Sequence, residues 1–331
     1  MDENLFDEHT TSRKQFVAGA LAAGAAVVAG RIPAAWAAGG WTFVDDRKQK
    51  VTLKARPTRV VAYSTAAAAL WQWGVTPVGV FGAAPQSDPA LAGFPWKKSA
   101  VVGSVYGEID VEKLLSLKPQ LIVSQWYPPP VNSPLFGFKD LTQEQTIGSQ
   151  VPIVGLNGHT IATNQISRFG DLARALGVNT KAGAVARAHA AFVKAAAHLA
   201  AVSKQKSNLR IIAVSGSQQY MYVAKVVDDG DLNFFKHRGF PIVSAATSSA
   251  YWDTLSWEQA GKYQADGIIY DARPFAMPVA DAKKIPTFAA LPAVQAGQVG
   301  PWEVGPVPTY QAYAKVMNNL ARTIGSWHKL T

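Results

Sequence analysis

The chain has 331 residues, of which 48% are apolar, so it can bury the core of one large domain or two medium ones and is not intrinsically disordered. It contains no cysteine, which excludes disulfides, a thiolate metal site, a cysteine nucleophile and a lipid-modified cysteine. The net charge is +10, but the basic residues form no dense run, so we expect no nucleic-acid partner.

The first expected element is an export signal over residues 1–37. A charged segment, TSRKQF, precedes the apolar run VAGALAAGAAVVAG, and Ala35-Trp36-Ala37 forms an A-x-A cleavage site. The Ser-Arg-Lys-x-Phe core is similar to a twin-arginine signal, with Lys14 in place of the second arginine. The apolar run is too short for a membrane span. We therefore expect an exported protein, in a periplasm or at another extracytoplasmic face, whose mature chain has no span.

Residues 41–160 predict an α/β lobe. Residues 41–54 alternate as an edge hairpin does. Strand-like segments (RPTRVVAYST, VTPVGVFG, QLIVSQ and VPIVGL) are then separated by short helical ones such as AAAALWQWG and DVEKLLSLKP. Strands that alternate with helices predict a parallel sheet.

The pattern changes over residues 161–204, which are strongly helical and carry no strand signal, and resumes in residues 205–331. The second half repeats the first at an offset of 146: DVEKLLSLKPQLIVSQWY aligns with LSWEQAGKYQADGIIYDAR, and Ile122 with Ile268. The fold predicted is therefore α/β, with two similar lobes of parallel-type sheets, a long helical backbone and a ligand cleft between the lobes.

Large aromatic residues occur where the predicted strands end. Ligands of open parallel sheets bind beyond the carboxyl ends of the strands, and tryptophan and tyrosine give a bulky ligand a rigid contact area with a polar group. One such aromatic residue more often packs in the core than binds, but several in both lobes favour a binding site. In the repeat, Tyr127 aligns with a basic residue, Arg273. The candidate ligand contacts are Tyr63, Tyr106, Trp126, Tyr127, Trp252, Arg273 and Trp302.

Catalytic and cofactor motifs are missing. The sequence contains no G-x-x-x-x-G-K-[ST], G-x-G-x-x-G or G-x-S-x-G, and its six histidines have no metal-ligand spacing. We therefore expect no cofactor, no bare metal site and no enzymatic activity. An exported α/β enzyme is the alternative of another class.

Four segments carry a family resemblance: residues 56–80, 102–124, 255–271 and 288–299. In this order they resemble the helical-backbone substrate-binding proteins of ABC importers, which carry iron–siderophores, haem or cobalamin, and most of all the ferric-hydroxamate type. The resemblance implies capture of a ferric siderophore or similar bulky chelate and delivery to an ABC permease dimer, with haem and cobalamin as alternatives. The ferric-hydroxamate type has an arginine where this chain has Val105 or Tyr106.

Glu112 and Glu258 align in the repeat, and each opens a short predicted helix. An acid in a first turn favours the helix dipole, which is one explanation for both. The resemblance implies another, in which one exposed glutamate per lobe docks into arginine pockets on the two permease subunits.

Overall fold

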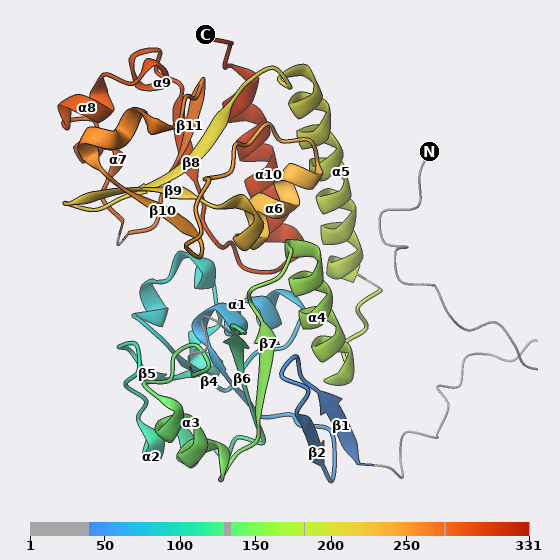
Figure 1. Ribbon diagram of the computed structural model, residues 1–331. Helices are drawn as coiled ribbons and strands as arrows, with labels where there is room; N and C mark the ends of the chain where they lie inside the picture. The colour runs from blue at the N-terminus through green and yellow to red at the C-terminus, as the bar shows by residue number, and fades with distance from the viewer. Residues whose placement is uncertain (1–39, 129–133, 182, 275, 331) are drawn as a thin grey trace, which may run out of the picture. The chain divides into compact units, whose positions relative to one another are not determined.

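The computed structural model describes residues 40–128, 134–181, 183–274 and 276–330 (Figure 1). The expected export signal lies outside these residues. The described chain begins with β1 (Trp41–Val44) and β2 (Lys50–Leu53), which pair antiparallel as the sequence alternation predicts. The buried Asp45 holds the turn between them, because its carboxylate accepts hydrogen bonds from the backbone N–H groups of Arg47 and Gln49.

The first lobe is built on a five-stranded sheet in the order β5-β4-β3-β6-β7, and all its strand pairs are parallel. The Ala-rich α1 starts directly after β3, and five of its residues are buried alanine or leucine in the main core. The strands are β3 (Val60–Tyr63), β4 (Gly79–Phe81), β5 (Ala100–Gly103), β6 (Leu121–Trp126) and β7 (Ile153–Asn157), and the helices are α1 (Ser64–Gln72), α2 (Val111–Ser116), α3 (Leu141–Gly148) and the 3-10 turns η2 (Pro85–Ser87), η3 (Pro89–Leu91) and η4 (Trp96–Lys98).

The second lobe has a five-stranded sheet in the order β10-β9-β8-β11-β12. Its β8, β11 and β12 are parallel, but β9 runs antiparallel to β8 and to β10. Only residues 217–219 join β8 to β9, which is too short for the crossover that parallel neighbours need. The elements are β8 (Ile211–Gly216), β9 (Tyr220–Ala224), η5 (Val226–Asp228), α6 (Gly230–His237), β10 (Trp252–Ser256), η6 (Trp257–Lys262), β11 (Gly267–Asp271), α7 (Val279–Ala282), α8 (Pro286–Ala289), α9 (Pro292–Gln295) and β12 (Val299–Trp302).

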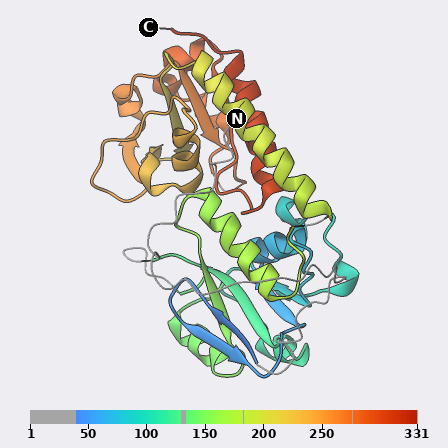
Figure 2. The same cartoon turned by 90° about the vertical axis from the view of Figure 1, so that its right-hand side faces the viewer.

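The strongly helical segment forms α4 (Ala162–Ala175) and α5 (Gly183–Gln205). Helix α5 packs along α10 (Tyr310–Gly325), and the two run side by side (Figure 2). The residues that contact each other across the two helices are separated by a nearly constant number of positions in the sequence. The ring of His189 packs on that of Tyr310, and just past the ends of both helices Lys206 Nζ donates to the Trp327 carbonyl. The helices are therefore parallel. No helix within the described ranges is long and apolar enough to cross a membrane.

The internal repeat corresponds to equivalent strands. Ile122 of β6 pairs with Val61 of β3, and Ile268 of β11 pairs with Ile212 of β8, so each strand lies beside the strand that comes first in sequence in its five-stranded sheet. A short helix precedes each, α2 in one lobe and η6 in the other. The 146-residue offset thus relates two copies of one helix–strand unit.

Candidate functional site

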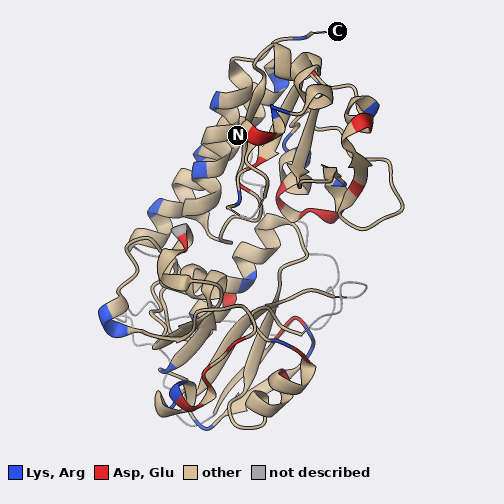
Figure 3. Cartoon of the chain, turned by 90° about the vertical axis from the view of Figure 1, so that its left-hand side faces the viewer, with Lys and Arg blue, Asp and Glu red and all other residues tan. Residues whose placement is uncertain are grey.

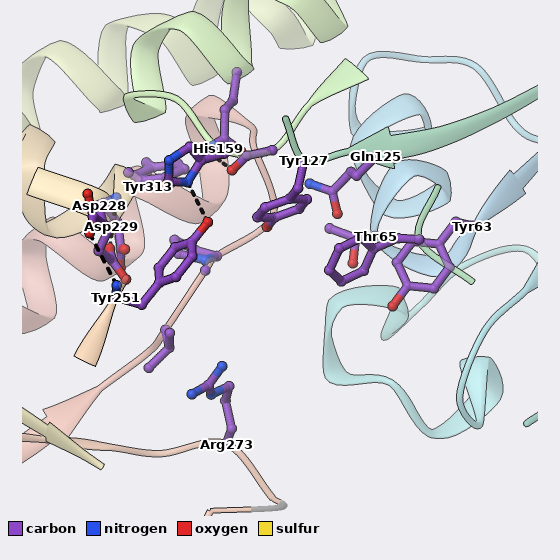
Figure 4. Close-up of a pocket in the computed structure, with 18 of the residues that line it drawn as sticks. Tyr63, Thr65, Gln125, Tyr127, His159, Asp228, Asp229, Tyr251, Arg273 and Tyr313 are labelled. Carbon is purple, nitrogen blue, oxygen red and sulfur yellow. Dashed lines mark hydrogen bonds between the residues drawn. The ribbon is translucent and has the colours of Figure 1, made fainter. Parts of the chain in front are cut away.

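A cavity of about 380 Å³ lies between the two lobes, at the carboxyl ends of their parallel strands (Figure 4). Tyr63 ends β3, Tyr127 follows β6 and His159 follows β7, while Arg273 follows β11 of the other lobe. The lining residues are Tyr63, Thr65, Gln125, Tyr127, Phe136, Gly158, His159, Gln165, Asp228, Asp229, Gly230, Asp231, Tyr251, Trp252, Arg273, Val304, Gly305, Pro306 and Tyr313.

Three rings form the wall of the first lobe. The centroid of Phe136 lies 4.7 Å from that of Tyr127 and 5.9 Å from that of Tyr63. Residue 158 must be small here, because a Cβ at Gly158 would lie 2.6 Å from Cε2 of Tyr127. Burial raises the pKa of Tyr63 to about 12 and raises that of Tyr127 as well, so both phenols are protonated at neutral pH and can donate hydrogen bonds.

A hydrogen bond joins the two lobes across the cavity. The Tyr251 hydroxyl lies 2.5 Å from His159 Nδ1, and the two rings meet edge to face (Figure 4). Tyr251 has a left-handed backbone, with φ of 62°. Its backbone N–H donates to Asp228 Oδ2 and its carbonyl accepts from the N–H of Lys225, which hold this conformation in place.

Three carboxylates at the start of α6 form the wall of the second lobe. Asp228 pairs with Lys225 at 3.1 Å, and Asp229 caps α6 by accepting from the backbone N–H of Leu232. Asp231 is fully buried and accepts a hydrogen bond from Trp302 Nε1 at 3.1 Å. Burial, with the neighbouring Asp229 carboxylate, raises the pKa of Asp231 well above its ordinary value. All three acids therefore have structural partners, and burial shifts Asp231 towards its protonated form.

Arg273 is the basic group of the cavity wall. Its guanidinium donates to Asp271, with Nη2 2.6 Å and Nε 3.0 Å from Oδ2. Asp271 is buried and also accepts from the Ser215 hydroxyl at 2.8 Å. The side chain of Arg273 stays 32% exposed, so the buried carboxylate fixes the orientation of a guanidinium that remains at the cavity surface.

The structure brings four of the seven candidate contacts to the cavity: Tyr63, Tyr127, Trp252 and Arg273. Trp126 faces the other side of the sheet, where it packs against a separate core cluster, because side chains alternate along a strand. Trp302 is fully buried behind the wall, with its indole N–H on Asp231. Tyr106 is 48% exposed, with its ring 6.5 Å from that of Tyr63, outside the cavity lining.

Sequence reasoning missed the bridge between the lobes and the acids of α6. His159 directly follows the run VPIVGLNG, so the strand-end rule that selected Tyr127 could have selected it too. Asp228 and Asp229 follow a strand that runs in the opposite direction, and the short link of residues 217–219 before that strand is the signal that could have indicated it. Glu112 and Glu258 lie away from the cavity as exposed residues of α2 and η6.

The cavity wall presents groups that can bind a ligand through hydrogen bonds and aromatic contacts. It offers protonated phenols, a fixed guanidinium, the amides of Gln125 and Gln165, and aromatic faces. Within the described part of the chain, no group of three or more His, Asp or Glu side chains is placed to hold a metal ion.

Comparison with known protein families identifies one that matches most of the chain. The profile of the family described as "Periplasmic binding protein" matches residues 60–302. No curated protein sequence matches this chain.

Solved structures are similar over most of the chain. DesE, a ferric-siderophore receptor protein from Streptomyces coelicolor, is 32% identical with a TM-score of 0.79, and the match covers 88% of this chain and 100% of DesE. The FhuD protein from S. pseudintermedius is 21% identical (TM-score 0.62; 87% and 98% covered), and Staphylococcus aureus SirA complexed with staphyloferrin B is 18% identical (TM-score 0.61; 87% and 99% covered). These last two show the fold alone. Together, the family match and the similarity to DesE show that the chain belongs to the periplasmic binding protein family, whose members bind solutes and are not enzymes.

Proposed function

We propose that this protein is an extracytoplasmic solute-binding protein that captures a ferric siderophore in the cavity between its lobes and delivers it to the permease of an ABC importer. The lobes of this proposal are residues 41–160 and 205–331, and residues 161–204 connect them. The proposal is supported by the 32% identity to DesE, which is described as a ferric-siderophore receptor.

The observation that carries the proposal is the composition of the cavity walls. Aromatic side chains of both lobes, among them Tyr127 and Trp252, face one space, and Arg273 stands at its edge. A ferric chelate is bulky, with oxygen atoms around the iron and apolar linkers between the chelating groups. Guanidinium and phenol groups donate hydrogen bonds to such oxygens, while the rings cover the linkers.

Ligand screening tests this proposal. The purified protein is titrated with ferrioxamine-type, ferrichrome-type and catecholate-type ferric chelates, haem and cobalamin, and quenching of tryptophan fluorescence is measured. We expect saturable quenching by at least one ferric chelate and none by its iron-free form. Saturation by haem or cobalamin alone would replace the siderophore by another ligand, and no binding of any of the five would refute the proposal.

Export is the second part of the proposal. The A-x-A site and the apolar run before it support a twin-arginine-like signal that is removed after Ala37. Amino-terminal sequencing of the exported protein should begin at Ala38. Exported protein that still begins at Met1 would contradict this.

Delivery to a permease is the third part. Glu112 and Glu258 are exposed, they occupy equivalent helices in the two lobes, and a permease dimer offers two equivalent sites. In Glu258, a hydrogen bond from the Ser256 side chain lowers the pKa, so this carboxylate is ionised at neutral pH. Two such charges would set the orientation and rate of docking.

A further inference from the structure

Helices α5 and α10 themselves contain no acidic residue, although Glu303, which precedes the loop into α10, accepts a hydrogen bond from Asn319 of that helix. Residues 176–210 and 304–331 include nine Lys and Arg residues and no Asp or Glu, although the whole chain has 22 acids. The basic residues are Lys181, Arg187, Lys194, Lys204, Lys206, Arg210, Lys315, Arg322 and Lys329. In sequence these charges are scattered, and the packing of α5 on α10 brings those on the two helices close to one another.

Four of these residues form what we call the basic ridge: Arg187 and Lys194 on α5, and Lys315 and Arg322 on α10. All four are exposed. Each pair is spaced by seven residues, so each forms a line along its helix. The two lines adjoin, because His198 Nδ1 of α5 lies 3.2 Å from Asn318 Oδ1 of α10. Figure 3 shows the basic residues spaced along these helices.

Local structure does not account for the ridge. Within the described residues, none of the four side chains forms an ion pair with a carboxylate. A cation stabilises the last turn of a helix, which explains Arg322 at the end of α10. Arg187 and Lys315 lie beyond the first turn of their helices and Lys194 lies in the middle of α5, so the helix dipole explains none of these three. The repulsion among these like charges calls for a partner of opposite sign.

We propose that the basic ridge docks the protein reversibly onto an anionic lipid bilayer. The two basic residues of each helix are seven positions apart, which is about 10 Å along the helix axis, and the two parallel helices present them side by side to a flat surface. Such docking would keep the protein close to the membrane that contains the permease of the proposed function.

In Figure 1, α5 lies at the upper right and α2, which carries Glu112, lies at the lower left. Docking through the ridge therefore leaves α2 uncovered. Each basic residue near an anionic surface contributes modestly, and salt within a Debye length of about 10 Å weakens the attraction. The docked state is thus weak, multivalent and sensitive to salt.

Vesicle co-sedimentation tests this inference. The purified protein is mixed with vesicles of phosphatidylcholine alone, or with about a third phosphatidylglycerol, at about 50 mM and about 300 mM NaCl. We expect binding only to the anionic vesicles and only at the lower salt. The ridge variant Arg187→Gln/Lys194→Gln/Lys315→Gln/Arg322→Gln should bind at least about tenfold more weakly.

A second variant removes the same charge elsewhere. Lys50→Gln/Lys54→Gln/Lys97→Gln/Lys98→Gln changes four exposed lysines of the first lobe, none in an ion pair with a described residue. It should keep most of the vesicle binding. Equal losses in the two variants would mean that net charge alone acts, and would overturn the inference.

Two further results would overturn it: no binding of the unmodified protein to anionic vesicles, or ridge-dependent binding of soluble polyphosphate without vesicle binding. Circular dichroism confirms that both variants are folded. Chelate quenching should be the same in both variants as in the unmodified protein, so the outcome is independent of the proposed ligand.

Discussion

Replacing Trp252 by alanine tests the assignment of the ligand site. The indole begins β10 and packs on the protein through Tyr222 and Trp302, with ring centroids 6.2 Å and 5.9 Å away, while the side chain also lines the cavity. A bound ligand would cover the part of the ring that these neighbours leave open. Trp252→Ala should therefore weaken ligand binding without removing the fold.

The size of the effect follows from the area that the ligand would cover. Aromatic side chains present roughly 150–250 Å². Trp252 is already largely buried, and about a quarter of that area, on the order of 60 Å², is left for the ligand. At about 25 cal/mol per Å², this area contributes about 1.5 kcal/mol. We expect an increase in Kd of roughly tenfold.

Fluorescence quenching, or calorimetry where the lost indole dims the signal, measures the Kd of the chelate that binds. Trp96→Ala is the matched control, because Trp96 is also largely buried and also packs on aromatic residues, with Phe94 4.7 Å away, but does not line the cavity. Its Kd should be unchanged. An unchanged Kd in a folded Trp252→Ala variant, or an equal increase in both variants, would refute the site.

Three other predictions concern the cavity walls and the docking acids. Burial raises the pKa of Asp231, so the folded state keeps a proton that the unfolded chain releases above about pH 4. The wild type should therefore lose stability as the pH rises from there towards the raised pKa. Asp231→Asn, which keeps an acceptor for Trp302, should be more stable than the wild type in urea unfolding at neutral pH but not in acid. An equal pH slope for both would contradict this. Tyr251→Phe should cost about 1 kcal/mol of unfolding free energy in the wild type and almost nothing in a His159→Ala background, as a double-mutant cycle measures; additive losses would show that their hydrogen bond contributes no coupling. Replacing Glu112 and Glu258 together by alanine should leave chelate affinity unchanged and strongly reduce uptake in cells with the cognate permease, whereas normal uptake would leave only the helix-dipole explanation.

The sequence by itself determined the order and type of most elements in this protein. Alternation over residues 41–54 predicted the hairpin of β1 and β2, and the repeat at an offset of 146 predicted that β6 and β11 are equivalent. These signals are local, because periods of 2 and 3.6 residues can be seen within one segment. The direction of β9 was not predicted, because the residue pattern of a strand is the same whichever way it runs; only the short link of residues 217–219 indicates an antiparallel pair.

Only the tertiary structure decided which strand-end side chains face the cavity. Trp126 and Tyr127 are neighbours in sequence, yet Tyr127 lines the cavity and the half-buried Trp126 packs against another cluster, because the side-chain period of a strand is two and one residue decides the face. Trp302 is buried behind the cavity wall, where it donates a hydrogen bond to Asp231. Tyr251 forms a hydrogen bond with His159, which is 92 positions away in the sequence. The position of each of these side chains depends on partners from distant segments, and only the packing of the two lobes brings those partners together.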